Sequence, residues 1–263
     1  MDTERIAIAC AGETHDIVLS SRGGGSELIF FIHGLGCAKE SFADAFPSPA
    51  LAPYSLAAID LPGFGDSPLP EGFSCALEDH AQVCLATLAS LPHGAVHIAG
   101  HSMGGAIAVL LAERLGKRLA SLVSIEGNLI GSDCTVSRRA VSITYDRSRE
   151  RLRRELMLAA RGPEEKGMRL WAEWSAKSNP RAFTESARSL VEWSDSGKLL
   201  SHFLALPCRK AYFFGERNRT IPVLSRLGPV PAIMINRSGH FLMNDNPDEF
   251  YTKRAAVLDG GSS

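Results

Sequence analysis

The residues best suited to do chemistry form the pentapeptide Gly-His-Ser-Met-Gly at positions 100–104. An apolar run, 95–99, precedes it, and a second apolar run, 105–111, follows it. A serine at a sharp turn between a strand and a helix needs small neighbours, because its backbone is strained, and the two glycines supply them. The following helix would also direct its positive end at the turn. The pattern predicts Ser102 as an exposed nucleophile, with a purely structural glycine-rich turn as the alternative.

Backbone amides that could bind an oxyanion lie in two places. His-Gly-Leu-Gly at 33–36 directly follows the apolar run 28–32. Acyl transfer requires N–H donors where negative charge develops on the carbonyl oxygen. We expect the amides of Leu35 and Met103 to form this oxyanion hole, with Gly36 a weaker candidate. Taken alone, 33–36 also fits an ordinary turn.

A general base is expected in Ser-Gly-His at 238–240, which follows the last apolar run of the chain. An imidazole with a pKa near neutrality can take the serine proton and return it to a leaving group. His240 is therefore the expected base. His97 lies inside an apolar run and is expected to be a core residue, whereas His101 is expected to point away from the site.

The elements that must position these residues alternate between strands and helices. Continuous apolar runs of this kind are typical of strands buried on both faces, and their alternation with helices indicates a parallel sheet. The expected strands are 6–10, 16–20, 28–33, 55–60, 95–100, 119–126, 209–214 and 232–236. The expected helices in this part of the chain are 75–91, 103–119 and 247–258.

One stretch breaks the alternation. Between positions 128 and 206 no segment has a convincing strand pattern, and all three tryptophans lie there. We therefore expect a core of residues 1–127 and 207–263 and a helical cap of residues 128–206. Trp171, Trp174 and Trp193 are expected to form an apolar ceiling over the nucleophile, or simply to anchor the insertion. Arg138 could reach inward toward an anionic substrate.

Four motifs in this order resemble the α/β-hydrolase superfamily, in its capped branch of small esterases and related enzymes. They are 33–36, 60–67 (Asp-Leu-Pro-Gly-Phe-Gly-Asp-Ser), 100–105 and 238–240. The resemblance covers the chain from about residue 28 to its end. It implies an α/β fold with a mostly parallel central sheet, flanking helices and an inserted helical cap.

The triad acid departs from the usual pattern of this superfamily. Its usual position, after the seventh strand, corresponds here to Asn218, whose amide cannot balance the charge of an imidazolium. Glu126, at the end of the sixth strand, occupies a position that some relatives use for the acid. We therefore expect the triad Ser102, His240 and Glu126, with Asn218 as the alternative acid position and Glu216 as a weaker candidate. On this view the exchange Asn218→Asp should change little.

Composition excludes several other classes. The chain has 263 residues, of which 45% are hydrophobic and 22% are charged, and its formal net charge is −1. This balance disfavours disorder and nucleic-acid binding, and no apolar run reaches the roughly 18 residues of a membrane span. The six cysteines show neither C-x-x-C spacing nor a zinc-like cluster, and no secretory signal is visible. We expect a cytoplasmic protein with a small-molecule substrate, no metal and no cofactor; monomer and dimer both remain open.

These expectations combine into a cofactor-independent serine hydrolase of small, hydrophobic esters or related acyl compounds, acting through a covalent acyl-enzyme. The same triad could hydrolyse thioesters or carbon–carbon bonds, or transfer acyl groups. An alternative hypothesis is that the protein is a sensor, which binds a ligand in a hydrolase-like pocket without turnover.

Overall fold

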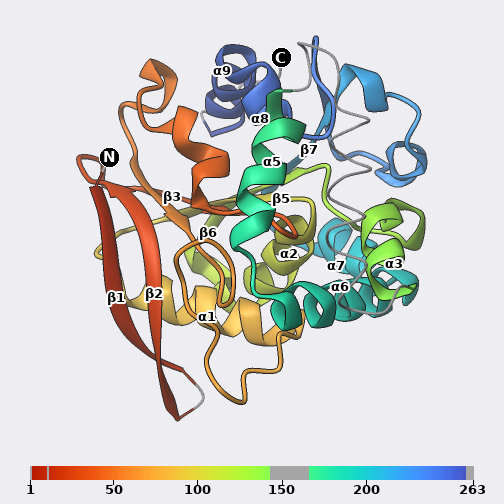
Figure 1. Cartoon of the computed structure of the whole chain (residues 1–263). Helices are drawn as coiled ribbons and strands as arrows, with labels where there is room; N and C mark the ends of the chain where they lie inside the picture. The colour runs from red at the N-terminus through yellow and green to blue at the C-terminus, as the bar shows by residue number, and fades with distance from the viewer. Residues whose placement is uncertain (1, 11, 143–165, 259–263) are drawn as a thin grey trace.

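A single eight-stranded sheet forms the centre of the molecule. The computed structural model describes residues 2–10, 12–142 and 166–258, and its strands follow the order β1-β2-β4-β3-β5-β6-β7-β8 (Figure 1). β1 and β2 pair antiparallel, as do β2 and β4, and the pairs from β4 to β8 are parallel. The strands are β1 Asp2–Cys10, β2 Glu13–Arg22, β3 Leu28–Ile32, β4 Ser55–Ile59, β5 Val96–His101, β6 Leu119–Ile125, β7 Arg209–Gly215 and β8 Ala232–Ile235.

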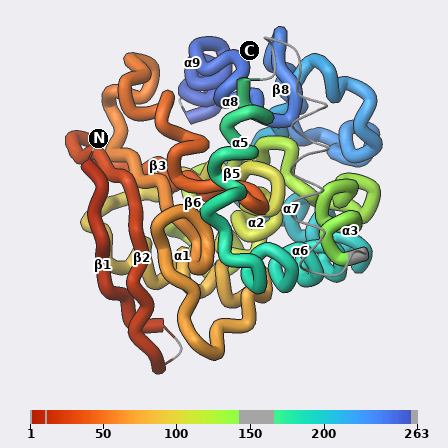
Figure 2. The backbone as a smooth tube through the Cα atoms, in the orientation of Figure 1, coloured from red at the N-terminus to blue at the C-terminus, as the bar shows by residue number. Residues whose placement is uncertain are grey.

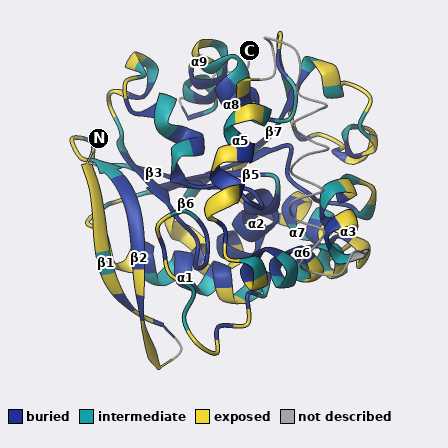
Figure 3. Cartoon of the chain, viewed as in Figure 1, coloured by how far each residue is buried: buried dark blue, intermediate teal, exposed yellow. Residues whose placement is uncertain are grey.

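Burial follows the position of each strand in the sheet. Every residue of β3 and β5 is buried, whereas the edge strand β1 is largely exposed (Figure 3). Central parallel strands are covered by helices on both faces, which is why their sequences are apolar without alternation. The structure confirms the expected fold class and contains a strand at each of the eight expected places.

Helices cover both faces of the sheet (Figures 1 and 2). The helices α1 (Leu77–Ser90) and α2 (Met103–Leu115) pack against each other on one side. The helix α9 (Pro247–Leu258) and the short 3-10 segment η1 (Lys39–Ala45) pack together on the other. Helix α2 is almost wholly buried, which matches its continuous apolar sequence. Its first residue directly follows Ser102, so the core of the sheet fixes the position of that serine.

The described part of the segment between β6 and β7 contains helices and no strand. Its elements are η4 Gly131–Asp133, α3 Thr135–Ser142, α5 Lys166–Lys177, α6 Pro180–Asp195 and α7 Lys198–Ala205. Helix α6 packs back onto the core: Nε2 of His80 is hydrogen-bonded to Ser186 Oγ at 3.0 Å, and the Leu77 amide donates to Ser189 Oγ at 3.1 Å. The division into a core and a cap at residues 128 and 206 stays a prediction.

The motif 60–67 has a structural role. Asp60 is fully buried and accepts hydrogen bonds from the backbone amide of Lys39 at 2.7 Å and from its ammonium group at 2.9 Å. Burial alone would lower the pKa of Lys39, but hydrogen bonds to Asp66, Asp60 and Glu40 raise it above its usual value. The buried ion pair ties the loop after β4 to the segment that follows the expected oxyanion loop.

Candidate active site

Ser102 occupies a strained turn between β5 and α2. Its φ of 54° and ψ of −119° lie in a region that residues with a Cβ rarely adopt. A Cβ at Gly100 would come within 2.3 Å of the Gly104 carbonyl oxygen, and one at Gly104 within 2.2 Å of the Ile32 carbonyl oxygen. The glycines of the motif are therefore required by backbone packing, as the sequence predicted. The turn exposes Ser102 to an internal cavity.

Glu126 and His240 lie in direct contact. Nδ1 of His240 is 2.7 Å from Oε2 of Glu126. Because a carboxylate only accepts hydrogen bonds, this nitrogen carries the proton and Nε2 is left as the acceptor. The Glu126 side chain is 5% exposed and follows β6 directly, with a φ of 42°. This pair has the geometry in which an acid orients the imidazole of a general base.

Asn218 lies beside the same carboxylate. Its Nδ2 donates to Oε1 of Glu126 at 2.9 Å and to Oε2 at 2.8 Å, and the Gly215 amide donates to Oε1 at 2.9 Å. The residue at the usual acid position thus holds the carboxylate that the sequence predicted as its substitute. The structure brings both candidate positions to one place, with only Glu126 carrying charge.

The Ser102 hydroxyl donates to Oδ1 of Asn128 at 3.1 Å. Nδ2 of Asn128 in turn donates to the Asp133 carbonyl at 2.7 Å, which fixes the orientation of the amide. Sequence reasoning missed Asn128, although its place two residues after Glu126 in the same loop was a usable signal. In the structure as described, the serine proton is directed to Asn128 rather than to His240.

His101 is the other functional neighbour that the sequence misjudged. It was expected to point away, but it lines the cavity, and its ring centroid lies 4.6 Å from that of His240. Its Nε2 donates to the His240 carbonyl at 3.0 Å. Burial lowers the pKa of His101 well below its usual value, so the ring is neutral. The reason is that β5 extends through His101, so this side chain remains in the sheet next to the loop of His240.

The loop 33–36 packs closely against the turn of Ser102. A Cβ at Gly34 would lie 3.1 Å from the Ser102 Cβ, and the Leu35 carbonyl accepts a hydrogen bond from Trp171 Nε1 at 2.9 Å. The Met103 amide is the first of helix α2. In the ranges that the structure describes, neither the Leu35 nor the Met103 amide donates to another group. Both remain available to an oxyanion beside Ser102.

A cavity of about 360 Å³ contains Ser102, His240 and Glu126. Its walls come from the loops after β3, β5, β6, β7 and β8 and from the helices α3 and α5. The other described residues that line it are Gly34, Leu35, Cys37, His101, Asn128, Ser132, Asp133, Thr135, Val136, Ser137, Met168, Trp171, Tyr212, Asn218, Ile221, Pro222 and Phe241. Of the four cap residues expected in the pocket, only Trp171 is among them.

The prediction for the other three cap residues was wrong. Trp174 is buried, its ring centroid lies 6.4 Å from that of Phe241, and it does not line the cavity. Arg138 is half exposed and pairs with Asp195 and with the Gly131 carbonyl, not with a group in the cavity. An arginine at the rim of the insertion can pair with a nearby carboxylate in solvent. Burying its charge in an apolar interior would cost more free energy.

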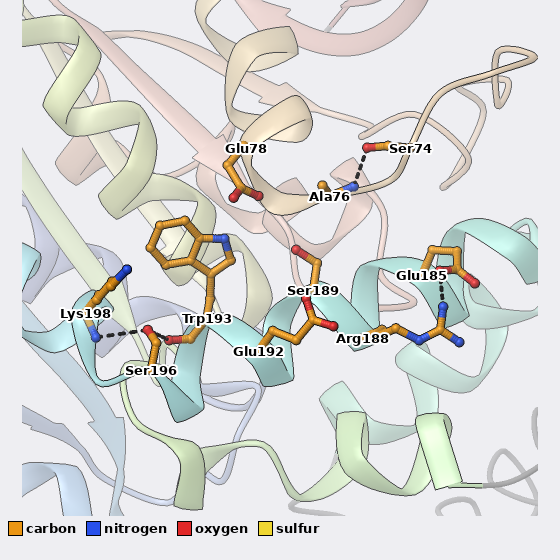
Figure 4. A pocket seen from close by; sticks show the side chains of 10 residues that line it. All are labelled: Ser74, Ala76, Glu78, Glu185, Arg188, Ser189, Glu192, Trp193, Ser196 and Lys198. Atoms are coloured by element: carbon orange, nitrogen blue, oxygen red, sulfur yellow. Dashed lines mark hydrogen bonds and ion pairs between the residues drawn. The ribbon is translucent and has the colours of Figure 1, made fainter.

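Trp193 lines a different hollow on the outer side of α6 (Figure 4). This hollow lies between the start of α1 and the helices α6 and α7, and it also contains Glu78, Glu192 and Lys198 (Figure 4). Trp193 lies beside the buried Leu190 and Ser194 on α6, where it is partly buried against the core and lines this hollow instead of the cavity of Ser102. The sequence does not show which side of α6 faces the cavity, because this depends on packing, and the prediction for Trp193 was wrong for that reason.

Two features of other protein classes do not occur in residues 2–10, 12–142 and 166–258. No three or more His, Cys, Asp or Glu residues there are grouped so that they could hold a metal ion. No helix there is both long enough and apolar enough to cross a membrane.

Known proteins resemble this chain over different lengths. The chain is 27% identical over 235 residues to the biotin biosynthesis bifunctional protein BioHC of Teredinibacter turnerae, covering 85% of this chain and 40% of that protein. It is 36% identical over 95 residues to a pimeloyl-[acyl-carrier protein] methyl ester esterase of Neisseria meningitidis, covering 36% of this chain and 34% of that protein. The chain thus spans well under half of these curated relatives, 40% at most.

The fold itself is shared along almost the whole chain. A thermophilic esterase from Thermogutta terrifontis superposes with a TM-score of 0.78 at 18% identity, covering 98% of both chains. The sequence profile of the alpha/beta hydrolase family matches residues 29–253, which include all four motifs. The chain therefore belongs to the alpha/beta hydrolase family, as the order of its motifs had indicated.

Proposed function

We propose that this protein is a carboxylesterase-like serine hydrolase that uses Ser102, His240 and Glu126 as its triad. One observation carries the proposal: the 2.7 Å contact between His240 and Glu126, inside the same cavity that exposes Ser102 on its strained turn. The family match and the esterases among the relatives support a hydrolase.

In the first half of the reaction, the substrate carbonyl enters beside Ser102. The serine hydroxyl leaves Asn128 Oδ1 and turns to Nε2 of His240, which is an acceptor because Nδ1 carries the proton. Ser102 Oγ then attacks the carbonyl carbon, and its proton passes to His240. Glu126 balances the imidazolium charge, and the Leu35 and Met103 amides donate to the oxyanion.

In the second half, the intermediate collapses. His240 returns the proton to the departing alcohol, which leaves an acyl group on Ser102. A water molecule, deprotonated by His240, attacks this ester and releases the acid. Apart from the substrate and this water molecule, the proposed steps use side chains and backbone amides of this chain.

The segment 128–206 would act as the cap over this site. Trp171 supports this assignment, because it lines the cavity and also donates to the oxyanion-loop carbonyl of Leu35. Leu35, Val136, Met168 and Ile221 also line the cavity, which fits a substrate with an apolar part.

The test is hydrolysis of p-nitrophenyl esters of increasing chain length, combined with labelling by a fluorophosphonate. We expect hydrolysis and labelling in the parent protein and the loss of both in Ser102→Ala. The control is Ser225→Ala, an exposed serine outside the cavity, which should retain both. Labelling that survives in Ser102→Ala would overturn the assignment of the nucleophile.

The same assays on the parent protein and on Ser102→Ala also distinguish two alternative functions. Thioester or carbon–carbon bond hydrolysis would appear as a higher kcat/KM on those substrates, still dependent on Ser102. A sensor without turnover would bind esters but show neither labelling nor product at neutral pH.

A further inference from the structure

The cavity is chemically uneven. Aromatic rings of Trp171, Tyr212 and Phe241 line it, and a polar wall is formed by Asn128, Ser132, Asp133, Thr135 and Ser137. Within the described ranges, its lining contains two carboxylates, Glu126 and Asp133, and neither lysine nor arginine. The wall charge seen here therefore favours neutral or cationic groups over anions.

The two carboxylates differ in what binds them. Glu126 accepts hydrogen bonds from Gly215, Asn218 and His240, so its charge is already compensated by donors of the proposed triad and its neighbours. Among the described residues, the Asp133 carboxylate accepts only from the amides of Leu129, at 3.2 Å, and Ile130, at 3.1 Å, both at the same oxygen, Oδ2. No described residue pairs with the other oxygen of Asp133, Oδ1.

Asp133 is also close to the reacting atoms. Its carbonyl accepts from Asn128, and Asn128 accepts from the Ser102 hydroxyl, so two hydrogen bonds link it to the nucleophile. Those bonds end at the Asp133 backbone, and Asp133 also lines the same cavity as Ser102, so a substrate that extends from the scissile carbonyl along this wall would meet its side chain.

The carboxyl group is ionised in mildly alkaline solution. Burial and the charge of Glu126 raise the pKa of Asp133. The Ile130 and Leu129 amides and the charge of Arg226 lower it. The resulting pKa is about 6. Tyr212 is near enough to contribute: burial, then the charges of Asp133 and Glu126, raise its pKa well above the usual value. At pH 8 the cavity wall, which also includes Tyr212, thus presents a negative charge.

We propose that the substrate of this esterase carries an ammonium group, held between the Asp133 carboxylate and the aromatic lining of the cavity. A carboxylate supplies charge, and aromatic faces attract ammonium groups through their quadrupole. The inference rests on the proposed serine hydrolase function and deepens it by naming a substrate class. It replaces the anionic substrate that the sequence had suggested through Arg138.

The test compares esters that differ only in charge. On the alcohol side the pair is butyrylcholine and its carbon isostere neohexyl butyrate. On the acyl side it is the p-nitrophenyl esters of γ-trimethylammoniobutanoate and γ-tert-butylbutanoate. At pH 8 we expect the cationic ester of at least one pair to have a kcat/KM about tenfold higher than its isostere.

The variant Asp133→Asn should bring this ratio close to one. Asparagine retains an oxygen acceptor for the Leu129 and Ile130 amides, so the loop that leads into α3 is kept while the charge is removed. The control Asp195→Asn removes an exposed carboxylate outside the cavity and should leave the ratio unchanged. Because the readout is a ratio within one preparation, it does not depend on the fraction of folded enzyme.

The outcomes separate the two proposals. Hydrolysis of the neutral esters without preference for the cationic ones overturns the ammonium inference alone. A preference that survives in Asp133→Asn also overturns it. If none of the esters is hydrolysed in a Ser102-dependent way, the proposed function fails, and the inference falls with it.

Discussion

At the scale of single residues, the carboxylate of Glu126 is the centre of the site. It contacts His240 Nδ1 and accepts hydrogen bonds from Nδ2 of Asn218 and the amide of Gly215. A carboxylate that receives several donors keeps one orientation. In this arrangement Glu126 supplies the charge and Asn218 supplies the fixed geometry.

Replacing this charge should greatly slow turnover. We expect Glu126→Gln to lower kcat by about 10³- to 10⁴-fold, because an amide cannot balance the imidazolium and can favour the wrong tautomer of His240. Steady-state kinetics on a p-nitrophenyl ester measures the loss. The matched control is Glu216→Gln, whose carboxylate accepts the Arg237 amide outside the cavity. Near-parental activity of Glu126→Gln would show that the acid lies elsewhere.

The geometry also changes the expectation for Asn218→Asp. The sequence suggested little effect, but the introduced carboxyl would stand within 2.9 Å of the Glu126 oxygens. Two carboxyl groups this close share a proton, and that proton could replace the Asn218 donor at low pH. We expect kcat to approach the parental value near pH 6 and to fall at least tenfold below it near pH 9. A kcat ratio to the parent that is the same at both pH values would contradict this.

The sequence did predict that Ser102, His240 and Glu126 lie close together, because each follows an apolar strand at the edge where a parallel sheet gathers its ligands. The contacts of Asn128 and His101 could not be predicted, although the place of Asn128 near Glu126 was a signal, because they are hydrogen bonds to Ser102 and to the His240 backbone. Such partners follow from side-chain packing, which the pattern of apolar residues does not encode.

At the scale of elements, the nucleophile depends on the close approach of helix α2 to strand β3. The space that a Cβ at Gly104 would need is taken by the carbonyl oxygens of Ile32, at 2.2 Å, and His33, at 2.5 Å. Both obstacles are backbone atoms, so neither can move aside as a flexible side chain could. The position of α2, and with it Ser102, is therefore tied to the sheet.

This contact predicts a large difference between two glycine substitutions. Gly104→Ala should lower the free energy of unfolding by about 3 kcal/mol or more, because backbone must shift. Gly116→Ala, at the end of the same helix, should cost only about 1 kcal/mol, since its φ of 53° is strained for alanine but no atom lies within 4 Å. Chemical denaturation of both variants gives the comparison. Equal losses would contradict the close-packed contact.

The elements themselves were largely predictable. All eight strands and the core helices appear where apolar runs and turn residues indicated them. The side on which Trp193 of α6 lies was not predictable, because apolar residues fall on more than one side of this helix: Val191 and Trp193 stand between the buried Leu190 and Ser194. A helix with mixed composition needs its partner surface before its faces can be assigned.

At the scale of the whole molecule, the core contains neutral histidines that hold its parts together. Burial lowers the pKa of His33 and of His101, and it lowers that of His80 to about 3. The unfolded chain binds protons near pH 6.5, where these native side chains do not. Their contribution to stability is complete above pH 6.5 and is lost as the pH falls from 6.5 toward 3.

We therefore expect the melting temperature to be at least about 5 °C lower at pH 5 than at pH 8, since each such group weakens folding by up to about 1.4 kcal/mol per pH unit. Asp133 opposes this trend, because its raised pKa favours the folded state as the pH falls through 6. In His80→Gln the difference between the two pH values should shrink, as glutamine can still bond to Ser186. Differential scanning calorimetry measures this; an unchanged difference would exclude His80 as a contributor.

The most direct test of the whole account is to look for the covalent intermediate. The protein is mixed with a p-nitrophenyl ester, quenched in acid within the first turnovers, digested and analysed by mass spectrometry. We predict a mass increase equal to the acyl group on the peptide that contains Ser102, absent in Ser102→Ala. Turnover of the ester with no acyl group on Ser102, or with the group on another residue, would contradict it.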